Sequence, residues 1–176
     1  MLCAIAIIDP AAVERLTELR RIAERSGVPP RDVHGHITLA TYIGADEAGF
    51  ISSCKAILSG RPKFPVCYHA VEVWASESGT KSLIVAAPRK DPAIASIQRE
   101  IARACPAGLN KWTREDTWNP HTSLLYVPGA DLSPVAEAMR QAFEPFVTQV
   151  DRIEFSRVYE NQGKFSYETA ETILLE

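Results

Sequence analysis

The 176-residue sequence predicts a two-lobed α+β domain that contains two copies of one structural unit. Strand-like and helix-like patterns alternate along the chain, and the same order of elements occurs twice. The spacing of matching residues supports the duplication, because His36 and His121 are 85 residues apart and so are Asp46 and Asp131. We therefore expect one domain with pseudo-two-fold symmetry that spans residues 1–176.

The first copy is expected to span about residues 1–80. Its opening apolar run is followed by Asp9 and Pro10, a pair that is typical of a helix N-cap and first helical position. Apolar residues then recur at helical spacing, and alternating runs follow. The expected elements are a strand at about 2–8, a helix from 10 to about 26, a strand at 36–42, a helix from 46 to about 60 and a β-rich run at about 64–74.

The second copy is expected to span about residues 81–176. Asp91 and Pro92 repeat the capping pair, and Asp131 lies where a further helix is expected to begin. The expected elements are a strand at about 81–87, a helix from 92 to about 106, a strand at 121–127, a helix from 131, and a hairpin of strands at about 146–159 and 164–174 with its turn at 161–163.

Composition and charge narrow the function classes. The 19 basic and 22 acidic residues give a net charge of −3, which argues against a large non-specific nucleic-acid surface. The apolar run Met1–Ile8 lacks a basic flank and is too short to span a membrane. We expect a cytoplasmic protein, monomeric and without a membrane partner. The four cysteines are scattered without metal-ligand spacing, and we expect free thiols at Cys3, Cys54, Cys67 and Cys105.

Two of the four histidines begin matching strands with the same pattern. His36 and Thr38 belong to the run HITL, and His121 and Ser123 belong to the run HTSL. Side chains alternate along a strand, so each histidine shares a face with its hydroxyl residue. A pseudo-two-fold axis would place the two polar faces opposite each other across a cleft.

This pairing suits the cleavage of a phosphodiester. A neutral imidazole can take a proton from the attacking group while a protonated one gives a proton to the leaving oxygen. The hydroxyls of Thr38 and Ser123 would donate hydrogen bonds to the non-bridging oxygens of the phosphate. We therefore predict His36 and His121 as catalytic residues, Thr38 and Ser123 as phosphate-binding residues, and no metal or other cofactor.

The twin motifs in a duplicated chain of this length resemble the 2H phosphoesterase superfamily, which includes 2′-5′ RNA ligase-like and cyclic phosphodiesterase proteins. The lead-in Trp118-Asn119-Pro120 before His121 and the closing hairpin are also similar to that family. The resemblance implies two antiparallel sheets flanked by helices, with the active cleft between the lobes.

The sequence departs from the family at one position of each motif. Many RNA-directed members carry an arginine five residues after the motif histidine, where this chain has Thr41 and Tyr126. The departure disfavours the RNA-ligase subtype. It also means that another residue must neutralise the charge of the phosphate. Basic residues near the second motif or the hairpins are candidates: Lys81, Lys111, Arg114 and Arg157.

Three aromatic residues are further candidates for substrate binding. Strand alternation places Tyr42 on the face of His36, whereas it aims Tyr126 away from the face of His121. Each tyrosine either contacts substrate or packs in the fold. Trp118 either forms a wall of the cleft or anchors the core beneath the lobe junction.

We expect an enzyme, a metal-independent phosphodiesterase that hydrolyses a 2′,3′-cyclic phosphate or a related diester of a small nucleotide or an RNA end. The alternatives are a 2′-5′ RNA ligase and a non-catalytic nucleotide-binding module of the same fold. Asp32, His34 and His36 resemble part of a metal site, but no further ligands follow at metallohydrolase spacing.

Overall fold

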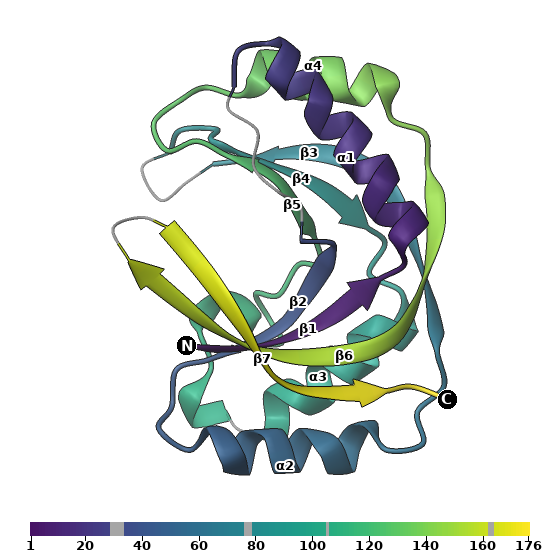
Figure 1. Ribbon diagram of the computed structural model, residues 1–176, viewed down its shortest axis with the longest axis vertical. Helices are drawn as coiled ribbons and strands as arrows, with labels where there is room; N and C mark the ends of the chain where they lie inside the picture. The colour runs from purple at the N-terminus through teal and green to yellow at the C-terminus, as the bar shows by residue number, and fades with distance from the viewer. Residues whose placement is uncertain (29–33, 76–78, 105, 162–163) are drawn as a thin grey trace.

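A computed structural model describes residues 1–28, 34–75, 79–104, 106–161 and 164–176 (Figure 1). The strands are β1 (Leu2–Ile8), β2 (His36–Tyr42), β3 (Phe64–Trp74), β4 (Leu83–Pro88), β5 (Thr122–Tyr126), β6 (Phe146–Asn161) and β7 (Lys164–Leu174). The helices are α1 (Pro10–Arg25), α2 (Glu47–Leu58), α3 (Pro92–Ala104) and α4 (Ser133–Ala142), with short 3-10 turns at Pro106–Gly108 and Lys111–Thr113. The α+β class and the order of elements expected from the sequence are confirmed; the turn expected at 161–163 lies largely outside the described residues.

Aspartates start two of the helices as their positions predict. Asp9 accepts a hydrogen bond from the backbone N–H of Ala12 at 2.8 Å, and Asp46 accepts one from Gly49 at the same distance. Asp131 differs, because helix α4 begins two residues later, at Ser133.

The strands form one antiparallel sheet in the order β2-β1-β6-β3-β4-β5, and β7 pairs with β6. The resemblance implied two separate sheets. The two halves are instead joined by hydrogen bonds between β3 and β6, from the pair Phe64 and Val150 to the pair Tyr68 and Phe146. Both strands are long, with 11 and 16 residues, so each can run through the junction.

The lobes exchange elements between the two sequence repeats (Figure 1). Strands β2, β1, β6 and β7 form one lobe, which α2 and α3 cover, and β3, β4 and β5 form the other, which α1 and α4 cover. The third strand of each repeat therefore pairs with strands of the other repeat.

The core lies between the helices and the outer face of the sheet. In β1, alternate residues from Leu2 to Ile8 belong to this core, whereas Ile5 and Ile7 lie on the inner face between the lobes. The inner face of β1 and β4 thus carries small and branched apolar residues, which line the side of the sheet that faces between the lobes.

Two expectations from composition can be compared with the described residues. Cys3, Cys54 and Cys67 are free thiols; only Cys54 is fully buried, and Cys105 lies outside the described residues. None of the helices within the described ranges is long and apolar enough to cross a membrane.

Candidate active site

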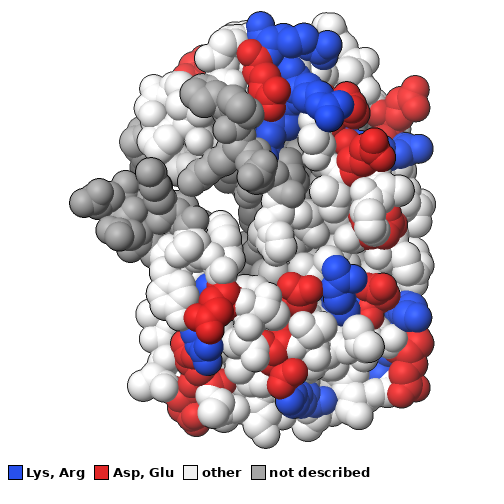
Figure 2. Space-filling view, in the orientation of Figure 1, with Lys and Arg blue, Asp and Glu red and all other residues white. Residues whose placement is uncertain are grey.

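The two histidine motifs meet although they lie at opposite ends of the sheet. His36 is the first residue of β2, His121 directly precedes β5, and these are the two outermost strands. The hydroxyl of Thr122 donates a 2.8 Å hydrogen bond to the carbonyl of His36, so the motifs are in direct contact. Figure 2 shows an opening between the two lobes, in the orientation of Figure 1. On the same face, positive and negative side chains are interspersed rather than gathered in a basic band.

The two imidazoles are held in the same way. His36 Nδ1 lies 2.8 Å from the carbonyl of His34, and His121 Nδ1 lies 3.0 Å from the carbonyl of Asn119. A carbonyl only accepts, so each Nδ1 carries the proton and each Nε2 is the nitrogen left for substrate. The backbone before His36 also packs tightly, because a Cβ at Gly35 would overlap the side chain of Val13.

Both histidines prefer the neutral state. Burial, together with repulsion from the nearby His34 and His121, lowers the pKa of His36 to about 4, against the opposing effect of its hydrogen bond to His34. Burial also lowers the pKa of His121, against the opposing effect of its hydrogen bond to Asn119. The charge on the ring of His121 therefore influences His36, as expected for two groups at one site.

The predicted phosphate-binding hydroxyls lie on the same faces as the histidines. Strand pairing places Thr38 beside Ile5 of β1, and Ser123 beside Val85 of β4, on the inner side of the sheet. Thr38 is half-buried and Ser123 is exposed. Within the described chain, neither hydroxyl makes a hydrogen bond, so both are available to a ligand. The structure thus brings together His36, Thr38, His121 and Ser123.

Both motif strands contain a β-bulge at the leucine of the motif. The pairing of β1 with β2 skips Leu39, and the pairing of β4 with β5 skips Leu124. An extra residue reverses the alternation that follows it. This corrects the side expected for Tyr42, whose ring lies in the core at 5% exposure and stacks on Phe50 at 4.8 Å.

The second bulge has the opposite effect on Tyr126. Strand alternation predicted that this side chain points away from His121, and this prediction is wrong. Tyr126 pairs with Leu83 and Ser123 pairs with Val85, so Tyr126 and Ser123 share the inner face. Tyr126 is 43% exposed and accessible to a ligand. Thr41 occupies the equivalent position after the first bulge.

Trp118 lies in the core rather than in the cleft wall. It is 3% exposed, and its indole N–H donates a 2.8 Å hydrogen bond to the carbonyl of Thr38. Of the two roles considered for Trp118, its burial favours that of an anchor in the core. Its backbone carbonyl accepts a hydrogen bond from Lys90.

Sequence reasoning missed two aromatic residues near the histidines, Trp74 and Tyr167. Trp74 meets the ring of His121 edge-on, with centroids 4.7 Å apart, and donates to Glu72 through its indole N–H at 2.7 Å. His34 lies 5.0 Å from His36 and stacks on Tyr167 of β7. A bulge at His69 sets the side of Trp74, so alternation alone gave no signal for it.

Arg20 of helix α1 is a buried cation behind the second motif. Its side chain donates to the carbonyl of Leu124 at 2.7 Å and to that of Ser123 at 3.4 Å. These carbonyls belong to the bulge, so Arg20 supports its geometry. Arg157, a candidate phosphate anchor, instead pairs with Glu47 at 2.8 Å on the outer side.

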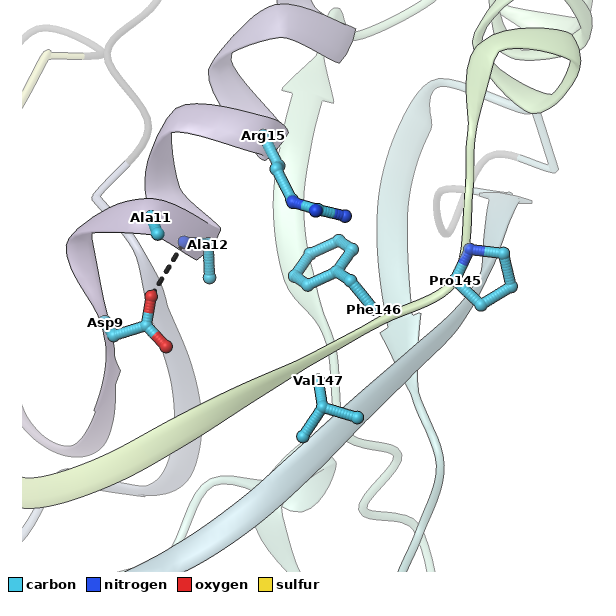
Figure 3. A pocket seen from close by; sticks show the side chains of 7 residues that line it. All are labelled: Asp9, Ala11, Ala12, Arg15, Pro145, Phe146 and Val147. Carbon is cyan, nitrogen blue, oxygen red and sulfur yellow. Dashed lines mark hydrogen bonds between the residues drawn. The ribbon is translucent and has the colours of Figure 1, made fainter.

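The structure offers little support for a metal site or for a site elsewhere. Across the described ranges, no three His, Cys, Asp or Glu side chains are grouped so as to hold a metal ion, and Asp32 lies outside those ranges. A pocket of about 340 Å³ lies at the start of α1, and none of its lining residues belongs to either histidine motif. Figure 3 shows the side chains that line it. Its carboxylate, Asp9, is already engaged by Ala12 and Thr148. This pocket therefore lacks free catalytic groups.

Comparison with known proteins agrees with this geometry. A family model described as the 2′-5′ RNA ligase superfamily matches residues 8–162. The chain belongs to this superfamily. The resemblance to 2H phosphoesterases drawn from the two motifs is thereby confirmed.

Solved structures share the fold of this 2′-5′ RNA ligase superfamily member at low sequence identity. TT0787 of Thermus thermophilus superposes with a TM-score of 0.73 at 15% identity, covering 99% of this chain and 98% of that one. E. coli LigT in its apo form gives a TM-score of 0.67 at 14% identity, covering 99% of this chain and 96% of that one. A search of curated protein sequences found no match.

Proposed function

We propose that this protein is a metal-independent phosphodiesterase that hydrolyses 2′,3′-cyclic phosphates or related small diesters of nucleotides or RNA ends. The observation that carries the proposal is the convergence of two imidazoles with similarly held Nδ1 atoms and of two hydroxyls that make no hydrogen bond to another described residue. The structures of E. coli LigT with 3′-AMP and with phosphate support the choice of ligand class.

His36 is assigned as the general base and His121 as the general acid. A bound phosphodiester anion raises the pKa of both rings. When the pair of imidazoles binds one proton, that proton favours the ring with the higher pKa. Repulsion from His34 disfavours protonation of His36. His121 therefore carries the proton when substrate binds, and His36 Nε2 is free to accept one.

The reaction proceeds by addition of water to phosphorus. His36 Nε2 takes a proton from the water as its oxygen bonds to phosphorus. The bond from phosphorus to the leaving sugar oxygen breaks, and that oxygen takes the proton from His121 Nε2. The products are a phosphomonoester and a free hydroxyl, and exchange with solvent restores both imidazoles.

Thr38 and Ser123 stabilise the charge that develops on the non-bridging oxygens. Each lies on its strand two residues after its histidine and so on the same face. Hydroxyl donors already oriented toward those oxygens stabilise the transition state with little reorganisation. None of these steps needs a Lewis acid, which is why we expect activity to survive chelation.

The test is hydrolysis of a panel of 2′,3′-cyclic nucleotides and short oligonucleotides ending in a cyclic phosphate, with EDTA present. His36→Ala and His121→Ala should each lower kcat about 10²- to 10⁴-fold. The double variant should be little worse, because the pair acts as a unit. His69→Ala, an exposed histidine of β3, is the matched control and should keep full activity.

The same panel separates the competing functions. Full activity in both single variants would refute the His/His mechanism, and loss of activity in EDTA would indicate a metal enzyme. Joining of a cyclic-phosphate end to a 5′-hydroxyl end would identify an RNA ligase. Binding of a nucleotide without turnover of any diester would identify a binding module.

A further inference from the structure

Strand β2 is the outermost in the sheet order, and side chains and backbone from residues 108–122 cover the carbonyls on its outer edge. The carbonyl of His36 accepts a hydrogen bond from the Thr122 hydroxyl, and the carbonyl of Thr38 accepts one from the Trp118 indole N–H. Further along, Thr41 O accepts from the backbone N–H of Asn110. An edge strand normally leaves such groups to water. Here they tie the strand that carries His36 to the segment that leads into His121.

Thr122 makes the most direct of these connections. It lies between His121 and Ser123 in the second motif and is 1% exposed. Its hydroxyl donates to His36 O at 2.8 Å. One hydrogen bond thus joins the backbone of the first motif to the side chain at the centre of the second.

Tyr68 fixes the orientation of the Thr122 hydroxyl. The two oxygens are 2.5 Å apart, and because the single proton of Thr122 goes to the carbonyl of His36, the phenol must be the donor. Tyr68 is fully buried, and its ring stacks on that of Phe146, with centroids 5.0 Å apart, where β3 pairs with β6. Burial raises the pKa of this phenol, so it keeps its proton throughout the neutral range.

The sheet by itself does not fix the separation of the two histidines. Four strands lie between β2 and β5 in the sheet order, and small changes in twist accumulate across them. Proton transfer on both sides of one phosphorus tolerates little misplacement, and an error of about 1 Å can cost about 10²-fold in rate. A direct connection between the two edges removes this freedom.

We propose that Thr122 and Tyr68 are positioning residues that hold His36 and His121 at the separation needed for catalysis. They act through the chain from the Tyr68 phenol to the Thr122 hydroxyl to the carbonyl of His36, here named the Tyr68–Thr122 clasp. Neither side chain contacts substrate. The role rests on the proposed function only for its kinetic consequence, since the geometry of the clasp is independent of the substrate.

The test compares Thr122→Val, Thr122→Ser and Tyr68→Phe. Valine keeps the shape of threonine but removes the hydroxyl, serine restores the hydroxyl, and phenylalanine removes one oxygen with the least risk to folding. Thr17→Val is the matched control, because Thr17 on α1 donates an equally long 2.8 Å hydrogen bond to Val13 O outside the clasp.

With a 2′,3′-cyclic nucleotide as substrate, Thr122→Val should lower kcat about 10- to 100-fold and change KM less than about threefold. Thr122→Ser should recover kcat to within about threefold of the wild type. The kcat of Tyr68→Phe should lie between those of Thr122→Val and the wild type. Thr17→Val should match the wild type. Unchanged kcat in both Thr122→Val and Tyr68→Phe would overturn the proposal, as would a loss that serine fails to restore.

Side-chain NMR of the two imidazoles gives a second readout that needs no turnover. Thr122→Val and Tyr68→Phe should shift or broaden the ring signals of His36 and His121, whereas Thr17→Val should leave them in place. If the wild type hydrolyses no diester, the proposed function fails while these spectra still decide the clasp. Identical ring signals in the wild type and in both clasp variants would refute it.

Discussion

Replacement of His36 by glutamine should change how the stability of the protein depends on pH. The folded protein holds the pKa of His36 at about 4, whereas a histidine in the unfolded chain titrates near about 6.5. The unfolded state therefore binds the extra proton first, and the free energy of unfolding decreases as the pH falls from about 6.5 to about 4. Below about 4 the ring is protonated in both states and adds no further loss.

The size of the effect follows from the same two values. Their difference corresponds to a ceiling of about 3 kcal/mol. The ring is half-buried at an open cleft, and screening by water reduces the expected contribution to about 1–2 kcal/mol. Glutamine does not titrate, so the variant should lack this part of the acid sensitivity.

The assay is urea unfolding of the wild type, His36→Gln and the exposed control His69→Gln between pH 4.5 and 8. The stability of His36→Gln relative to the wild type should rise by about 1–2 kcal/mol from the highest pH to the lowest. His69→Gln should run parallel to the wild type. Parallel curves for all three proteins would refute the lowered pKa of His36 and with it the assignment of the base.

Four other substitutions test separate parts of the site. Thr38→Val and Ser123→Ala should each lower kcat/KM for a 2′,3′-cyclic nucleotide about 10- to 1000-fold, and an unchanged value would exclude the hydroxyl as a phosphate ligand. Trp118→Phe leaves Thr38 O without its donor and should lower the free energy of unfolding in urea by about 1–3 kcal/mol; no loss would contradict the anchoring role. Tyr42→Phe should keep kcat/KM within about twofold, because the ring lies in the core, and a large loss with intact folding would return Tyr42 to the substrate site.

Much of the fold follows from local patterns in the sequence. Aspartate caps, proline at the first helical turn and apolar periodicity act within a few residues, so the helices begin and end close to where these patterns predict. The histidine motifs were found because the same pattern occurs twice in the sequence, 85 residues apart. The joined sheet was not predicted, since the pairing of β3 with β6 connects segments more than 70 residues apart.

The face of the sheet toward which each side chain points was harder to predict than the positions of the strands. Tyr42 and Tyr126 were both placed by simple alternation, and both placements failed at a bulge. A bulge depends on how two strands pair, which neither strand encodes alone. Trp74 was missed for a related reason, because its closeness to the ring of His121 arises only when segments far apart in the sequence come together.

The exchange of strands between the repeats limits what either half can do on its own. A peptide with only the first repeat would keep β1, β2 and β3, but β1 would lose its β6 neighbour and β3 would lose both β4 and β6. Those edges could regain their hydrogen bonds only from another chain, so two such peptides would pair as a closed, symmetric dimer or would aggregate. In the 176-residue chain both sets of strands are covalently linked, and this linkage allows the two sides of the cleft to differ. Thr41 and Tyr126, each five residues after its motif histidine, show the difference that a symmetric pair of identical halves could not have.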